Sequence, residues 1–190
     1  MNRKLCAFAA ASIAMMINGC ATIHSTSHCI SFGYDKSICL LPPEMLPKIV
    51  GAHMITIEHN GKKKMFIGLL RIDSRTIRLN GSSLLGPDLF TVTYNGHSLN
   101  STPPNTLNHP GILIAMLELV VANPHILRGA LQGMVLRQMI PSKSEQVRNL
   151  YTRRRLFMHI AIYGDQLSHA SVRMDIPSAH LIVLRQPSPS

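Results

Sequence analysis

The order of hydrophobic patterns along the chain most constrains its fold. Apolar and polar residues alternate through residues 54–99 and again through 134–185, which is typical of strands with one buried face. Between them, residues 111–121 (GILIAMLELVV) form an apolar run that directly follows Pro110 and is too long for an ordinary strand. This order predicts an α+β domain, mainly antiparallel β, in which one curved sheet surrounds buried helices.

Turn-forming pairs divide the alternating regions into short strands. Asn60-Gly61, Asn95-Gly96 and Gly164-Asp165 each indicate a hairpin between two strands. A second helix is predicted from Pro124 to Leu131, ended by Gly133. The predicted strands cover residues 54–58, 65–72, 76–79, 89–94, 97–99, 134–139, 156–163, 167–173 and 181–185.

The first twenty residues are typical of a bacterial lipoprotein precursor. Arg3 and Lys4 precede an apolar run of 13 residues, Leu5–Ile17. That run is too short to cross about 30 Å of hydrocarbon as a helix, so we interpret residues 1–19 as a signal peptide. The run ends in Ile17-Asn18-Gly19-Cys20, which resembles a lipobox and predicts acyl chains on Cys20. The alternative, a buried helix with an incidental Cys, fits poorly because polar residues follow at once.

The residues after Cys20 indicate location and organisation. In the familiar sorting rule an Asp after the lipidated Cys retains the protein at the inner membrane, so Ala21 predicts the outer membrane, with the protein facing the periplasm. We expect residues 20–40 to form a tether, 41–186 a lipid-binding domain and 187–190 a disordered tail.

Cys29 and Cys39 lie ten residues apart in a compartment that permits disulfides. A disulfide and a buried free thiol both remain open. His24 and His28 precede Cys29, but the spacing lacks the paired pattern of a zinc motif, and we expect neither metal nor cofactor.

Removal of Arg3 and Lys4 with the signal peptide lowers the formal net charge from +10 to +8, which suits an anionic lipid surface, a lipid head group or an acidic partner. No aromatic residues are interleaved with the basic clusters Lys62–Lys64 and Arg153–Arg155, which are typical of solvated turns or strand ends, and the chain has no Trp. We therefore expect no nucleic-acid partner.

Motifs of catalysis are missing from the sequence. It has no Gly-x-Ser-x-Gly elbow, phosphate-binding Gly-rich loop or His-Glu-x-x-His, so no catalytic residue is assigned and an enzyme is not expected. Glu118, the one charge in the apolar run, either pairs with an Arg such as Arg71 or Arg137 or faces solvent. His159 and His169 are interpreted as sheet-surface residues.

Residues 78–96 (RLNGSSLLGPDLFTVTYNG) resemble the central hairpin of small lipoproteins often encoded beside aryl polyene pigment biosynthesis genes. The layout of residues 40–186 fits that family, which in turn is similar to the outer-membrane lipoprotein receptor LolB and its soluble carrier LolA. The resemblance implies an incomplete antiparallel barrel whose helices plug the concave face over an apolar, acyl-binding cavity.

In LolB a loop between two strands presents an exposed Leu before a Gly, and Leu85 before Gly86 matches it. We therefore expect Leu84 and Leu85 to form a membrane-insertion loop, although LolB has Pro where this chain has Leu84. The expected partners are membrane lipid, a lipid-like cargo and a LolA-like carrier, with the protein as a monomer. The alternative is a non-enzymatic scaffold of an envelope assembly. The candidate cavity-lining residues are Phe66, Leu69, Phe90, Leu113, Met116, Leu117 and Val120.

Overall fold

The computed structural model describes residues 28–59, 62–104, 109–164, 170–176 and 182–185. The predicted signal peptide, the lipidation site Cys20 and the tail at 187–190 lie outside the described residues.

A ten-stranded antiparallel sheet dominates the structure. Its strands run in the order β7-β6-β5-β4-β3-β13-β12-β11-β10-β9, and it is not closed into a barrel, because β7 and β9 do not pair with each other. Strand β3 pairs with β13, which brings the two ends of the domain together. The strands are β3 (Ile49–His59), β4 (Lys62–Ile72), β5 (Ile77–Ser82), β6 (Asp88–Tyr94), β7 (Leu99–Thr102), β9 (Val135–Ser142), β10 (Glu145–Thr152), β11 (Arg155–Tyr163), β12 (Ser171–Asp175) and β13 (Ile182–Arg185).

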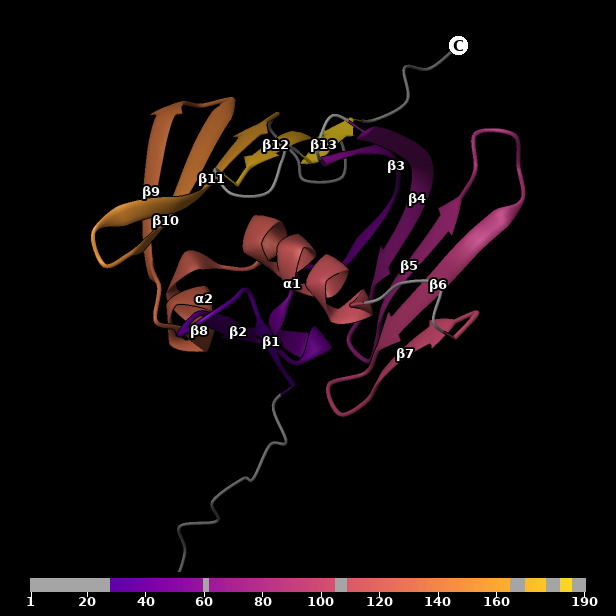
Figure 1. Ribbon diagram of the computed structural model, residues 1–190, viewed down its shortest axis with the longest axis horizontal. Helices are drawn as coiled ribbons and strands as arrows, with labels where there is room; N and C mark the ends of the chain where they lie inside the picture. Colours follow the sequence, from indigo (N-terminus) through magenta and orange to yellow (C-terminus); the bar gives the residue numbers. More distant parts are fainter. Residues whose placement is uncertain (1–27, 60–61, 105–108, 165–169, 177–181, 186–190) are drawn as a thin grey trace, which may run out of the picture.

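The large sheet curves around helix α1, and a second, three-stranded sheet lies on the other side of that helix (Figure 1). Helix α2 lies beside this small sheet, which has the order β1-β2-β8. The remaining elements are β1 (Cys29–Ser31), β2 (Ser37–Cys39), the short 3-10 helix η1 (Pro43–Met45), α1 (Pro110–Val121), α2 (Pro124–Ala130) and β8 (Leu131–Gln132).

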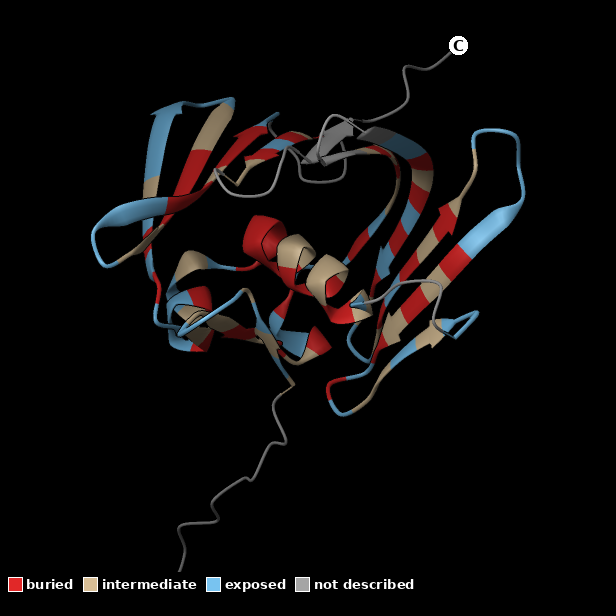
Figure 2. Ribbon diagram, viewed as in Figure 1, coloured by how far each residue is buried: buried red, intermediate tan, exposed pale blue. Residues whose placement is uncertain are grey.

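The core lies between α1 and the concave face of the large sheet. Alternation along the strands builds it: in β5, Ile77 and Leu79 are buried, whereas Arg78 is exposed (Figure 2). Helix α1 is apolar on nearly every face because it has protein on both sides, and Ile114 and Leu119 are fully buried. Pro110 occupies its first turn, where a missing N–H is not needed.

The predicted class, α+β and mainly antiparallel, is confirmed by the two helices and the two sheets. The Asn95-Gly96 turn is also present, with the Asn95 side-chain oxygen accepting hydrogen bonds from the backbone N–H of His97 and Ser98 at 3.0 and 2.7 Å. Gly96 there has a φ of +88°, which glycine adopts without steric cost. Residues 60–61 lie outside the described part, but β3 and β4 pair up to His59 and Lys62.

Two segments differ from the sequence-based expectation. Strand β10 was not predicted, because Arg148 and Asn149 are both buried and break its alternation. Residues 29–39 were assigned to the tether, whereas they form the hairpin β1–β2, in which Ile38 is fully buried. The folded part of the chain thus begins earlier than expected.

Candidate functional site: an apolar groove and cavity around helix α1

A small cavity lies between helix α1 and the concave face of the large sheet. Its volume is about 70 Å³. Strands β3, β4, β5 and β12 supply one wall, and His53 is the one polar side chain among the described lining residues. The other wall is a stripe of α1 at helical spacing, made of Leu113, Met116, Leu117, Val120 and Val121.

A larger groove opens beside this cavity, with a volume of about 630 Å³. Its size falls in the range of about 300–1,000 Å³ typical of small-molecule sites, whereas the inner cavity alone does not reach that range. Strands β1, β7 and β11 and the first turn of α1 form its walls. The described lining residues are Cys29, Ile30, Ser31, Phe32, Leu99, His109, Pro110, Gly111, Ile112, Met116, Phe157 and Ile176.

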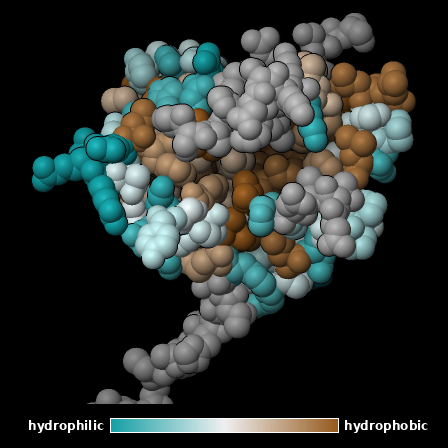
Figure 3. Space-filling view, viewed as in Figure 1, coloured by the Kyte–Doolittle hydropathy of each residue, from teal (hydrophilic) through white to brown (hydrophobic). Residues whose placement is uncertain are grey.

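Met116 lines both the groove and the cavity, so one flexible side chain separates them. A thioether side chain adapts readily to an irregular space. Viewed as in Figure 1, hydrophobic side chains gather around a hollow near the centre of the molecule (Figure 3). The groove and the cavity therefore adjoin at one deformable side chain.

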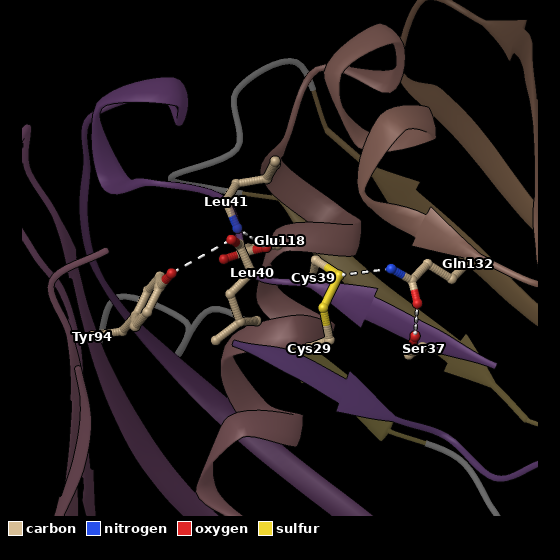
Figure 4. Close-up of a disulfide and its surroundings, with 8 residues drawn as sticks. All are labelled: Cys29, Ser37, Cys39, Leu40, Leu41, Tyr94, Glu118 and Gln132. Atoms are coloured by element: carbon tan, nitrogen blue, oxygen red, sulfur yellow. Dashed lines mark hydrogen bonds between the residues drawn. A yellow bond between two sulfur atoms is a disulfide. The ribbon is translucent and has the colours of Figure 1, made fainter. Parts of the chain in front are cut away.

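The hairpin β1–β2 forms the floor of the groove and packs directly on α1. Ile30 lies so close to Gly111 that a Cβ at position 111 would overlap its Cδ1 atom. A disulfide joins Cys29 to Cys39, which are cross-strand partners in this hairpin (Figure 4). Of the two alternatives for this cysteine pair, a disulfide and a buried free thiol, the structure contains the disulfide.

Glu118 is fully buried within α1 and faces neither solvent nor an arginine. Its Oε2 accepts a hydrogen bond of 3.0 Å from the backbone N–H of Leu41, and its Oε1 has no partner in the described part of the chain. Burial raises the pKa of Glu118 to about 8, although the Leu41 hydrogen bond acts in the opposite direction. The carboxyl group is therefore mostly neutral at pH 7, and both sequence interpretations of Glu118 were wrong.

Tyr94 completes this polar cluster at the end of β6 (Figure 4). Its hydroxyl donates to the carbonyls of Leu40 and Gly96 at 3.4 and 3.2 Å. Burial, followed by the charges of Glu118 and Glu44, raises the pKa of Tyr94 to about 12. Glu118 and Tyr94 together attach the segment after β2 to the helix and to the sheet.

Arg148 in β10 caps the C-terminal end of α1. Its Nη1 donates to the carbonyl oxygens of Leu119 and Ala122 at 2.8 and 2.9 Å, where the helix leaves carbonyls unpaired. Burial lowers the pKa of Arg148 to about 10, so the guanidinium remains charged at neutral pH. This contact fixes α1 against the half of the sheet that contains β9–β11.

The structure divides the candidate cavity residues into three groups. Leu113, Met116, Leu117 and Val120 line the cavity. Phe66 and Phe90 are buried in the core and contact each other edge to face, with ring centroids 5.3 Å apart.

Leu69 does not line the cavity: it is 48% exposed on the outer face of β4, which corrects that expectation. The reason is the two-residue period of a strand, which places positions 66 and 69 on opposite faces.

Leu84 and Leu85 lie in the loop between β5 and β6, with exposed fractions of 54% and 95%. Gly86, which follows them, has a φ of +112°, and its N–H donates to the carbonyl of Ser83. The loop projects beyond the sheet on the side away from β1 (Figure 1). Of the predicted surface histidines, His159 contacts Asn149 Oδ1 through Nδ1 at 2.7 Å, and His169 lies outside the described residues.

Several lining residues were missed by the sequence interpretation. Ile30 and Phe32 lie in the supposed tether, and Phe157 and Ile176 had no assigned role. The alternation Ile30-Ser31-Phe32 is a strand signal that could have identified the first two.

Two kinds of feature are not found in the part of the chain that the structure describes. None of its helices is long and apolar enough to span a membrane. Its His, Cys, Asp and Glu side chains form no group of three or more that could hold a metal ion.

Comparison with known proteins identifies a family. A family model described as a protein of unknown function, DUF3261, matches residues 52–182. The match covers more than half of the chain, and the chain belongs to this family. It runs from β3 to the first residue of β13 and leaves out the hairpin β1–β2. No curated protein and no solved structure matched the chain.

Proposed function

We propose that this protein is an outer-membrane lipoprotein that binds the apolar part of a lipid-like molecule for delivery within the cell envelope. The observation that carries the proposal is the groove of about 630 Å³, which adjoins the inner apolar cavity at Met116. Its walls are mainly aliphatic and aromatic, as in sites for hydrophobic ligands. Binding and release of such a cargo need no covalent chemistry.

The position of the groove relative to Cys20 supports the same proposal. Seven residues separate Cys20 from His28, and the eight fully extended steps between these two residues reach about 26–29 Å. The groove is lined by Cys29–Phe32, the first residues of the folded domain. A lipid anchor on Cys20 would therefore hold the groove close to the bilayer, where a lipid cargo is found.

The likeness to LolB and LolA supports a role in transfer. The open curved sheet with α1 on its concave side is the arrangement expected of an incomplete barrel with a helical plug. The exposed Leu85 is suited to contact a membrane during release. On this proposal a LolA-like carrier supplies the cargo, which is either a lipoprotein's acyl chains or an aryl polyene-type lipid.

The test purifies the full chain from the envelope of a bacterium with two membranes and identifies its bound molecules by native mass spectrometry. Cells labelled with radioactive palmitate are analysed in parallel, with Cys20→Ser as the unacylated control. We expect an amphiphile on the protein and label that depends on Cys20. A protein free of amphiphile in every preparation would contradict the cargo role, and label that persists in Cys20→Ser would contradict the anchor.

A scaffold is the second candidate, favoured by one observation. The edge strand β9 exposes Val135, Met139 and Ile140, at 60%, 53% and 65%, beside its unpaired backbone groups. Such an edge can accept a strand from another protein. If Ile140→Lys abolishes the cellular function and Met116→Trp preserves it, the scaffold replaces the carrier.

A further inference from the structure

The outer face of strands β3–β5 is unusually apolar for a surface without cover. Antiparallel strands with one solvated face normally place polar residues outward. Here the outward positions of β3 and β4 are mostly apolar. We call the following residues the convex patch: Val50, Ala52, Met54, Met65, Ile67, Leu69, Arg71 and Arg78.

Exposure confirms that the patch meets solvent. Val50 is 75% exposed, Leu69 48% and Met65 38%, although each could be polar without disturbing the core. Val50 is the cross-strand partner of Arg71, and Ala52 is the partner of Leu69. A hollow of about 380 Å³ lies between these rows and reaches Arg78 and Asn80.

Two positive side chains flank the apolar residues at one end. Arg71 and Arg78 are direct cross-strand partners, so two like charges stand opposite each other, which destabilises a sheet. Arg71 has one long, exposed contact of 3.7 Å with Asp73, which contributes little. Arg78 has no ion pair in the described part of the chain. An unfavourable pair of like charges that has little compensation nearby is typical of a functional surface.

No described side chain that points outward from β3–β5 is acidic. A second copy of the chain, placed symmetrically on this patch, would bring two further arginines to the two already there, with Asp73 at the edge as the carboxylate beside them. A phospholipid surface offers both complements: phosphate oxygens for the guanidinium groups and an apolar layer for Val50, Leu69 and Met65. Without residues 1–19, which contain Arg3 and Lys4, the formal net charge falls by 2 from +10 to +8, and this charge favours an anionic surface over a neutral one.

We propose that the convex patch docks on an anionic phospholipid bilayer, with Arg71 and Arg78 binding lipid phosphates and Val50, Leu69 and Met65 entering the interface. This contact is separate from the groove around α1, which opens on the concave side. It does not require the protein to carry a cargo. Docking would fix the orientation of the domain relative to the bilayer.

The lack of Trp in the chain allows a direct test, because one introduced Trp is the sole indole. Val50→Trp and Leu69→Trp place it on the patch, and Val135→Trp, at a site 60% exposed on β9, is the matched control. The full chain is reconstituted in vesicles of phosphatidylglycerol and phosphatidylcholine, or of phosphatidylcholine alone. Emission wavelength and quenching by bromine-labelled lipid report contact of the indole with the bilayer.

We expect blue-shifted, quenched emission from both patch reporters in anionic vesicles and from neither in neutral vesicles or high salt. Replacing Arg71 or Arg78 by Gln should lower the ratio of docked to undocked protein about fivefold each. Equal quenching of Val50→Trp and Val135→Trp, or equal quenching in both lipid mixtures, would overturn the proposal. A blue shift without vesicles that grows with protein concentration would also overturn it, in favour of a second copy. If the protein docks on anionic vesicles but binds no cargo, the result would contradict the proposed function and leave the docking proposal standing.

Discussion

The buried carboxyl group of Glu118 accepts a hydrogen bond of 3.0 Å from the backbone N–H of Leu41. This contact joins the last turn of α1 to the segment that follows the disulfide-linked hairpin. Glu118 therefore fixes the helix to the segment that follows β2, while Arg148 holds the carbonyls at the C-terminal end of the helix.

Replacing Glu118 by Gln should reduce the dependence of stability on pH. The pKa of Glu118 rises from 4.5 in the unfolded chain to about 8 in the folded protein, so the folded state binds more protons between these values. The free energy of unfolding of the wild type should therefore fall as pH rises from 5 to 8, by on the order of a few kcal/mol. Gln keeps an oxygen for Leu41 and does not ionise.

Urea unfolding at pH 5 and pH 8 measures this difference. We expect the midpoint of the wild type to fall more than that of Glu118→Gln. The exposed Glu44→Gln variant serves as a control and should behave like the wild type. Parallel shifts in wild type and Glu118→Gln would show that another group controls the pH dependence.

Removing the disulfide should destabilise the floor of the groove. Cys29 and Cys39 are ten residues apart. A disulfide that closes a loop of that size raises the free energy of unfolding by about 2–3 kcal/mol, because it restricts the unfolded chain. We expect guanidinium unfolding of the wild type to shift to lower denaturant when a reductant is added. The Cys29→Ser, Cys39→Ser double variant should have the same denaturant midpoint as the reduced wild type, and that midpoint should not change when the reductant is added. A double variant as stable as the oxidised protein would contradict the role of the disulfide.

A charge at the tip of the β5–β6 loop should impair transfer and leave folding intact. Leu85 is 95% exposed, so Leu85→Glu should change the free energy of unfolding by less than about 0.5 kcal/mol. Resonance energy transfer between fluorophores reports the movement of a fluorescent lipid from the protein to acceptor vesicles. We expect this movement to be markedly slower with Leu85→Glu than with the wild type. Leu156→Glu, at a site 43% exposed on β11, is the control and should transfer at the wild-type rate. Equal rates for both variants would remove the loop from the mechanism.

The sequence predicted the elements that follow simple periodicity and missed those that depend on tertiary contacts. Helix α1 and the hairpin at Asn95-Gly96 follow from local patterns, and both are present. Strand β10 was missed because its buried Arg148 is stabilised by helix carbonyls that are distant in sequence. The burial of Glu118 depends on Leu41 in the same way.

The candidate site was predicted in part for the same reason. The helical stripe Leu113–Val120 follows from spacing alone. To place Phe66 inside and Leu69 outside, in contrast, one must know which face of β4 is buried. The groove could not be predicted, because it exists where β1, β7, β11 and α1 meet. Its walls come from segments that no local pattern connects.

Calorimetric titration of the full chain with dodecanoate tests the central claim most directly. Met116 lies between the groove and the cavity, so Met116→Trp should obstruct both, and a penalty of about 1.4 kcal/mol or more for entry of the alkyl chain corresponds to a loss in affinity of about tenfold or more. Met139→Trp makes the same change at a site 53% exposed on β9. Circular dichroism establishes that both variants are folded. We predict that the wild type and Met139→Trp bind dodecanoate with equal affinity and that Met116→Trp binds at least about tenfold more weakly. Equal affinities in all three folded proteins would contradict the account.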